Sequence, residues 1–389
     1  MLIRGSDQVK ILKYIDKWLL LISTLLFVIG LVMVFSSSNV AAFMRYSSSP
    51  YRFVLRQAIF LLVGVIISLI AVRFSTKFYG FIAWPGLLAI TIILALVLLY
   101  GKLAGGAVSW IDIGPFTFQP SEFAKIIMIV WMASFYDINR NKLDKYSTSL
   151  FPLILCAIIV CLLMLQPDLG TAIIFAGIVG FIFLIVPIDF KIKYRTILIV
   201  IIGAVLGVII IVSNGGNLFF QHQIERFNFT NPCSEEKFYD QGNQVCNGYI
   251  AINNGGLLGK GLGNSTQKYL YLPDSHTDFI FPIVIEELGL LFGLFILLLY
   301  IFLLARIVII AHNSYNNRNA IMCYGVAFYI FLHIVINLMG VLGMMPMTGV
   351  PLPFLSYGGS FTICLVVALT IVQRVAIENN TKKLSKKEG

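Results

Sequence analysis

The stretch YLPDSHTDFIFPIVIEELG places ionisable side chains at the start of a long apolar run. His276, Thr277 and Asp278 come just before the run, and Glu286 and Glu287 lie about two helical turns inside it. A carboxylate at a membrane surface can accept a proton from a reacting hydroxyl group. A carboxylate inside the hydrocarbon costs at least a few kcal/mol unless it is paired or faces water, which makes such residues functional candidates.

Helix capping is the structural alternative for this stretch. Ser275, Thr277 or Asp278 can satisfy free backbone N–H groups where the run begins. Capping does not explain Glu286 and Glu287. These two residues are about 100° apart on a helix, so at most one of them is expected to line a central cavity.

Further charged residues lie at the edges of other apolar runs. Glu122 and Lys125 are three residues apart, so they share one helical face and can form an ion pair. Asp168 lies in the turn QPDLG, and Arg56 follows Arg52 by one helical turn. For the arginines, extension of a long side chain to the membrane interface is the alternative to a role in binding.

Anion binding is a second kind of chemistry that the residues allow. The segment GGLLGKGLGN lacks the P-loop spacing, and no strand and helix flank it as in a dinucleotide fold. Its glycines can still let backbone N–H groups approach a phosphate, and Lys260 adds a positive charge. A plain flexible turn is the alternative. No His or Cys pair has metal-site spacing, so no structural metal is predicted.

The elements that hold these residues are expected to be membrane-spanning helices. Of the 389 residues, 59% are hydrophobic and only 12% are charged, a composition typical of an integral membrane protein. A spanning helix needs about 20 mainly apolar residues, and ten such runs are present. They begin near Trp18, Val54, Phe78, Phe123, Leu150, Thr171, Thr196, Ile280, Ala320 and Phe361. Because nine further runs follow, the first is interpreted as a span rather than a cleaved signal peptide.

Lysine and arginine predict the orientation. If the N-terminus is inside, most of the 28 Lys and Arg residues fall in inner segments, as cytoplasmic loops require. We therefore expect an all-α membrane domain at 18–378 with an outer loop at 214–279. A segment at 1–17 and a basic tail at 379–389 are then cytoplasmic. The net charge of +10 suits an anionic inner leaflet and requires no nucleic acid.

Two of the six cysteines, Cys233 and Cys246, share the longest outer loop. That side of the membrane is an oxidising compartment if the predicted topology holds, so we predict a disulfide between them. The other four cysteines lie in predicted spans, where a thiol behaves as a small hydrophobe.

Several motifs of the predicted outer face occur in an order that resembles a known family. They are VSWIDIGPFTFQPSEFAK, QPDLGTA, GKGLGNSTQKYLYLPDSHTDFIF, EELG and GVPLPFLSYGGS. This series resembles the SEDS family, the FtsW and RodA proteins of bacterial wall synthesis, from the first span to the last. The resemblance implies ten transmembrane helices in the cytoplasmic membrane. It also implies a peptidoglycan glycosyltransferase that polymerises lipid II into glycan strands at the outer face.

The resemblance also implies roles for individual residues. Asp278 matches the family's essential aspartate and is expected to act as general base. Arg56, Lys125 and Lys260 are candidates to bind the departing pyrophosphate, and a divalent cation, Mg²⁺ or Mn²⁺, could share that work. The full set of expected substrate-binding residues is Arg56, Trp110, Glu122, Lys125, Asp168, Lys260, His276, Thr277, Glu286 and Ser356.

The choice of branch and partners also rests on the resemblance. GLGNSTQKYLYLP resembles division-type FtsW proteins, whereas GVPLP also occurs in RodA, and we favour the FtsW branch. The implied partners are lipid II, the nascent glycan strand, membrane lipid, a class B penicillin-binding protein and membrane proteins of the divisome or elongasome. A RodA-like elongation polymerase, a lipid II flippase and a scaffold remain alternatives. A transporter is expected to contain inverted repeats, and no repeat is evident in the sequence.

Overall fold

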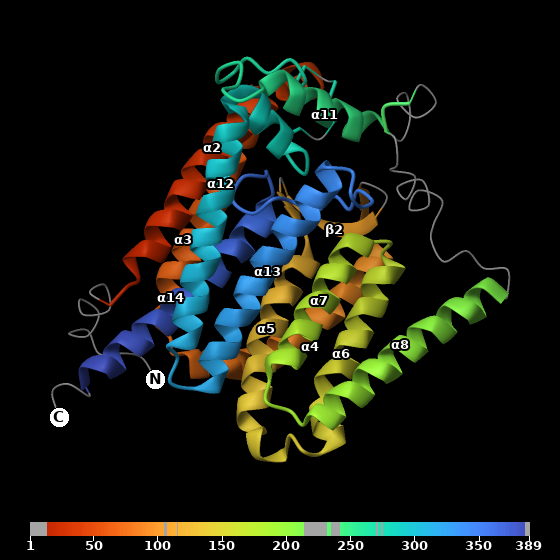
Figure 1. Ribbon diagram of the computed structural model, residues 1–389, viewed down its shortest axis with the longest axis vertical. Helices are drawn as coiled ribbons and strands as arrows, with labels where there is room; N and C mark the ends of the chain where they lie inside the picture. Colours follow the sequence, from red (N-terminus) through yellow and green to blue (C-terminus); the bar gives the residue numbers. More distant parts are fainter. Residues whose placement is uncertain are drawn as a thin grey trace.

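The computed structural model describes residues 14–104, 107–114, 116–213, 232–234, 242–269, 271–273 and 275–385. Most of the predicted segment 1–17, the end of the basic tail and much of the loop 214–279 lie outside the described residues. Helices account for most of the described chain (Figure 1). They are α2 (Lys17–Met44), α3 (Arg52–Ala71), α4 (Thr76–Tyr100), α5 (Pro120–Ile138), α6 (Tyr146–Leu165), α7 (Leu169–Ile185), α8 (Phe190–Ser213), α11 (Asn243–Gly255), α12 (Ile280–His312), α13 (Asn317–Val341) and α14 (Gly359–Ser385).

Each of the ten predicted apolar runs lies in a helix, and α11 is an additional helix in the predicted outer loop. Among the described residues, seven helices are long and apolar enough to cross a membrane, namely α2, α3, α4, α6, α12, α13 and α14. The helix α7 is apolar but has only 17 residues. The helix α5 contains the three charged residues Glu122, Lys125 and Asp137, which lower its mean hydropathy.

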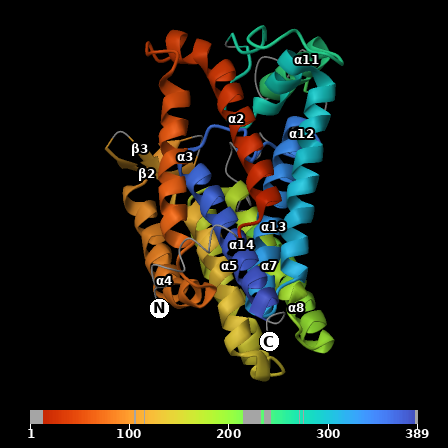
Figure 2. The same ribbon diagram turned by 90° about the vertical axis from the view of Figure 1, so that its left-hand side faces the viewer.

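Most of the helices form one elongated bundle with α5, α13 and α14 inside it, whereas α8 diverges from the bundle and α11 lies across one end (Figures 1 and 2). Small residues allow close helix approach, as is common in membrane bundles. A Cβ atom at Gly80 of α4 would lie 2.1 Å from the Ser134 hydroxyl of α5, and one at Gly325 of α13 would lie 2.7 Å from Ile129 of α5. The outer helices expose apolar side chains such as Leu55 and Phe81, as expected for a lipid-facing surface.

Polar contacts tie the helix ends together at the end of the bundle opposite α11. Asp16 caps α2 by accepting from the Leu19 N–H at 2.9 Å, and it pairs with Arg306 of α12. The Asp16 carbonyl accepts from Gln373 of α14, and Asn380 donates to the Tyr14 carbonyl. The start of α2 and the end of α14 therefore lie at the same end of the bundle (Figure 2).

At the other end, a small antiparallel sheet connects α4 to α5. Its strands are β1 (Lys102–Ala104), β2 (Ala107–Ile113) and β3 (Phe116–Phe118), in the order β1-β2-β3. Asp112 pairs with Thr117 across the β2–β3 turn. The Val108 N–H donates to the Gln166 carbonyl at 3.1 Å, which holds β2 against the turn between α6 and α7. The sheet thereby forms one wall of the site described next.

Candidate active site

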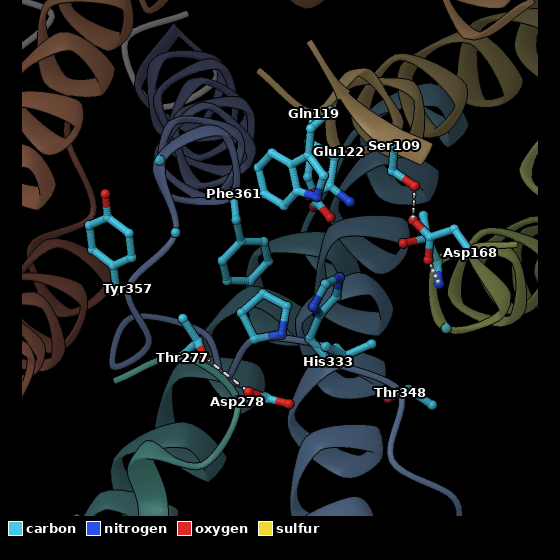
Figure 3. Close-up of a pocket in the computed structure, with 18 of the residues that line it drawn as sticks. Ser109, Gln119, Glu122, Asp168, Thr277, Asp278, His333, Thr348, Tyr357 and Phe361 are labelled. Atoms are coloured by element: carbon cyan, nitrogen blue, oxygen red, sulfur yellow. Dashed lines mark hydrogen bonds between the residues drawn. The ribbon is translucent and has the colours of Figure 1, made fainter. Parts of the chain in front are cut away.

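A cavity of about 490 Å³ lies at the end of the bundle where the sheet is found (Figure 3). The ends of α3, α5, α7, α13 and α14 surround it. Its wall includes residues from β2 and from the segment that precedes α12. The structure brings together seven residues that the sequence analysis singled out, although they come from five separate parts of the chain. They are Arg56, Trp110, Glu122, Lys125, Asp168, Thr277 and Asp278.

Asp278 is half-buried at the cavity wall. The Thr277 hydroxyl donates to its Oδ1 atom at 3.0 Å (Figure 3). The backbone is held from two sides, because the Asn337 amide donates to the Asp278 carbonyl at 2.8 Å and the Ser356 hydroxyl donates to the Thr277 carbonyl at 2.5 Å. The carboxylate is therefore held in a defined position beside a space large enough for a substrate.

None of the three residues expected to cap α12 occupies its N-cap position. The N-cap position of α12 is occupied by Phe279, which makes no side-chain capping bond. The Ser275 hydroxyl instead donates to the Ser37 carbonyl of α2 at 3.2 Å. The tertiary contacts of the 275–279 segment place Asp278 before the N-cap, where its side chain borders the cavity.

The predicted ion pair of Glu122 and Lys125 is present, with 2.8 Å between Lys125 Nζ and Glu122 Oε1. The Lys125 ammonium also lies 3.1 Å from His333 Nε2 and 5.7 Å from the centroid of the Tyr329 ring. The Lys125 side chain is 0% exposed. Lys125 thus lies in the cavity wall but is covered, and this arrangement does not give pyrophosphate direct access to it.

The sequence analysis did not identify His333 as a site residue. If Lys125 is protonated, it donates to Nε2, so the neutral imidazole carries its proton on Nδ1. The ring stacks on Phe361 at a centroid distance of 4.7 Å. An ionisable residue within an apolar run was the available signal, since such residues mark functional sites by default.

Asp168 caps α7 and faces the cavity. Its carboxylate accepts from the Thr171 N–H at 3.1 Å and from the Ser109 hydroxyl of β2 at 3.1 Å (Figure 3). Asp168 therefore has a structural role, since its carboxylate joins the sheet to α7. The predicted contact with substrate would use the same carboxylate.

Arg56 is a half-buried cation that borders the cavity at the start of α3. It hydrogen-bonds Tyr357; burial raises the pKa of the Tyr357 phenol, and the nearby Arg56 partly offsets that increase. Next to it, the Gln57 amide donates to Thr362 at 2.9 Å and accepts from the Gly358 N–H at 3.1 Å. These bonds fix the start of α3 against the segment before α14.

His276 and Ser356 do not line the cavity but support its wall. The His276 ring lies 4.5 Å from that of Phe53 and 5.9 Å from that of Tyr357, measured between centroids. Ser356 holds the Thr277 carbonyl, as described above. In this structure both residues contact the parts of the chain that form the cavity wall, and their expected contact with substrate stays a prediction.

The described residues include no group of three or more His, Cys, Asp or Glu side chains that could hold a metal ion. Asp278 and Asp168 lie in the same cavity but do not form such a group. No chemical step is assigned to a divalent cation.

The sequence profile of the FtsW/RodA/SpoVE family of cell cycle proteins matches residues 16–381. The chain belongs to this family. A probable peptidoglycan glycosyltransferase FtsW of Bacillus subtilis is 35% identical over 388 residues, covering 96% of this chain and 94% of that protein. A probable peptidoglycan glycosyltransferase FtsW of Enterococcus hirae is 33% identical and covers 93% of this chain and 94% of its own length.

Solved structures show the same FtsW/RodA/SpoVE fold. One is a chain from a study of how a peptidoglycan synthase complex coordinates polymerization and crosslinking. It superposes with a TM-score of 0.74 at 25% identity, covering 94% of this chain and 98% of that chain. The rod shape determining protein RodA of Thermus thermophilus gives a TM-score of 0.66 at 25% identity, covering 93% and 96%.

Two candidate residues of this FtsW/RodA/SpoVE family member lie away from the cavity. Glu286 accepts from the Ser265 hydroxyl at 2.5 Å and pairs with Lys260 at 3.3 Å, while Glu287 pairs with Lys268 at 2.9 Å. Neither glutamate lines the cavity. Both are buried under the segment that follows α11, so the predicted contact of Glu286 with substrate is not supported by the lining of this cavity.

Two N–H groups of the glycine-rich segment, where a phosphate site was considered, bond to α12 instead. The N–H groups of Lys260 and Gly261 donate to the backbone carbonyls of Glu286 and Glu287, each at 2.9 Å. A Cβ atom at Gly259 would lie 2.4 Å from the Glu287 carbonyl oxygen. The glycines are needed for close backbone contact with α12, and these N–H groups cannot serve a phosphate at the same time.

Cys233 and Cys246 form a disulfide in the structure, with Cα atoms 5.1 Å apart. Cys246 lies in the first turn of α11, so the bridge ties this helix to the residues around 232–234. The predicted disulfide is therefore present, and it closes a loop between residues 233 and 246.

Proposed function

We propose that this protein is an FtsW-type peptidoglycan glycosyltransferase that polymerises lipid II at the outer face of the bacterial cytoplasmic membrane. The observation that carries the proposal is the half-buried Asp278 carboxylate in a cavity that also contains Arg56. The relatives named as probable peptidoglycan glycosyltransferases, which match over nearly the whole chain, support it.

The proposed reaction joins two lipid-linked sugars. The hydroxyl oxygen of the acceptor sugar forms a bond to the anomeric carbon of the donor, and the bond from that carbon to the lipid pyrophosphate breaks. Asp278 takes the hydroxyl proton. Arg56 stabilises the negative charge that develops on the pyrophosphate. A cavity of about 490 Å³ has the size of a small-molecule site, so it holds the reacting sugars while the lipid chains stay in the membrane.

The test is polymerisation by the purified protein. Lipid II is supplied in detergent or bilayers, with and without a class B penicillin-binding protein, and glycan strands are resolved by gel electrophoresis. We expect strands of many disaccharides from the parent protein. Movement of lipid II across vesicle membranes without any polymer would favour the flippase alternative. Neither polymer nor transport would favour the scaffold.

The topology is part of the proposal. We infer that α5, α7 and α8 span the membrane together with the seven helices that are long and apolar enough to cross it, which gives ten spans within 18–378. The segment 1–17 and the tail 379–389 are then cytoplasmic, and the loop 214–279 is external. The location of the start of α2 and the end of α14 at one end of the bundle, opposite α11, supports placing both ends of the chain on the side opposite this loop.

Cysteine labelling tests the orientation. Tyr271 is 63% exposed and Lys383 is also exposed, so a cysteine at either position can react once a reagent reaches it. A membrane-impermeant maleimide is expected to label Tyr271→Cys in intact cells and Lys383→Cys only after permeabilisation. The parent protein controls for its native thiols. The reverse pattern would place the cavity at the cytoplasmic face and contradict the proposal.

A class B penicillin-binding protein is the proposed partner, together with other membrane proteins of cell division. The similarity to a chain from a study of a peptidoglycan synthase complex supports a shared complex with a crosslinking enzyme. The FtsW names of the relatives support the division branch over the RodA-like alternative.

A further inference from the structure

The helix α12 is interrupted at Gly289, which has φ 86° and ψ 164°. In a continuous α-helix, the N–H groups of Leu290 and Leu291 would donate to the carbonyls of Glu286 and Glu287. The interruption removes these two bonds. Because α12 is among the apolar helices that can cross a membrane, unpaired backbone groups here would cost several kcal/mol each if they faced lipid.

The segment 256–262, which we call the leucine loop, replaces both lost bonds. Leu290 N–H donates to the Gly256 carbonyl at 2.9 Å and Leu291 N–H donates to the Leu257 carbonyl at 3.2 Å. In the opposite direction, the loop's own N–H groups at 260 and 261 donate to the two helix carbonyls, as described above. All four backbone groups freed by the break are thus satisfied by protein rather than by water.

This close fit depends on glycine on both sides. A Cβ atom at Gly289 would lie 2.3 Å from the Leu257 carbonyl oxygen, and one at Gly255 would lie 2.1 Å from the Ile285 carbonyl oxygen. Such distances leave no room for a side chain or for water between the loop and the helix. The loop and the broken helix therefore form one dehydrated unit.

The outward side of this unit is apolar. Leu257, Leu258 and Leu262 are 62%, 81% and 54% exposed. Leu290 and Leu291 of α12, whose N–H groups bond the loop, are 38% and 55% exposed. The loop leucines therefore continue the apolar surface that α12 presents on the outside of the bundle.

The depth of the loop follows from the length of α12. Arg306 pairs with Asp16 near the inner end of the helix, a pair suited to the inner membrane interface. A hydrocarbon layer of about 30 Å corresponds to about 20 helical residues. Counting that distance from Arg306 toward the outer end reaches Glu286, beside which the leucine loop lies. The loop is thus at the outer boundary of the hydrocarbon.

We propose that the leucine loop is a membrane-inserted element whose leucine side chains contact the acyl chains of the outer leaflet. Non-helical backbone is tolerated at membrane depth where other parts of the protein satisfy its polar groups. Here the loop and α12 satisfy the four backbone groups at the break. The loop belongs to the segment that leads from α11 to Asp278, so the bilayer anchors this segment directly.

Tryptophan quenching in bilayers tests the proposal independently of catalysis. Leu258→Trp places an indole at the most exposed of the loop leucines, and Asn253→Trp, at an exposed position of α11, is the matched control. The parent protein supplies the signal of the four native tryptophans, which is subtracted. In bilayers of acyl-brominated phospholipid, we expect loss of the added emission from Leu258→Trp and little loss from Asn253→Trp. Aqueous iodide should give the opposite ranking.

Emission from Leu258→Trp that is quenched by iodide and unaffected by brominated lipid would overturn the proposal. Shielding from both quenchers by a co-purifying protein would also overturn it, since the loop would then be a protein contact. Leu262→Trp provides a second probe on the same loop. Equal melting temperatures of the variants and the parent establish that the loop is folded.

Discussion

Asp278→Asn is expected to lower the rate of lipid II polymerisation by a factor of about 10² to 10⁴, the usual loss when a general base is removed. Asparagine is nearly isosteric with aspartate, and the Thr277 hydroxyl can still donate to the side-chain oxygen at this position. The Asn337 and Ser356 bonds involve the backbone and are unchanged. The amide cannot accept the hydroxyl proton, so the rate falls without loss of the fold.

Asp168→Asn is the matched control, because it makes the same change in the same cavity. Asparagine caps helices about as well as aspartate, so the α7 cap should survive and the rate should fall much less than in Asp278→Asn. A rate for Asp278→Asn near that of the parent, together with a large loss for Asp168→Asn, would assign the base to Asp168. Glu286 is not an alternative base, since it lies outside the cavity and is buried beneath the leucine loop.

Lys125→Ala is expected to lower the free energy of unfolding by about 3–5 kcal/mol, because it leaves the buried Glu122 carboxylate without its cation. The alternative response is protonation of Glu122, which carries a similar cost at neutral pH. Thermal unfolding of the purified variant in detergent measures the effect.

Replacing both partners distinguishes loss of charge balance from loss of packing. The double variant Glu122→Gln, Lys125→Met removes both charges while keeping similar volumes, so it should recover much of the stability. Lys260→Ala is a second comparison. Its side chain is 33% exposed, and its buried partner Glu286 also accepts from the Ser265 and Thr266 hydroxyls, so we expect a smaller loss than for Lys125→Ala. Equal melting temperatures for Lys125→Ala and the parent would show that the pair is not required for stability.

The local sequence pattern was sufficient to predict the helical framework of this protein. The predicted start of each apolar run falls inside a helix, because length and composition are properties of a contiguous segment. The spacing of Glu122 and Lys125 was likewise sufficient to predict their ion pair, since residues three positions apart share a helical face. The grouping of Arg56, Asp168 and Asp278 in one cavity agrees with the expectation carried by the motif series.

The roles of other residues depended on contacts between distant segments. Lys125 is spaced to meet Glu122, but its coverage by His333, 208 positions away, is set by the packing of α5 against α13. Ser356 and Asn337 each hold a carbonyl of the Asp278 segment from other parts of the chain. Nothing in the local sequence of any of these residues encodes its partner.

The glutamates and the glycine-rich segment show the physical reason most clearly. Sequence alone established that Glu286 and Glu287 are charged residues in an apolar run and that the glycines near Lys260 permit close backbone approach. The sequence could not establish which group approaches the glycine backbone. The break at Gly289 frees backbone groups that only another segment can satisfy, and the tertiary structure supplies the leucine loop rather than a phosphate. Hydrogen-bonding capacity is a property of residues, whereas the partner that fills it is decided by which segments the fold brings together.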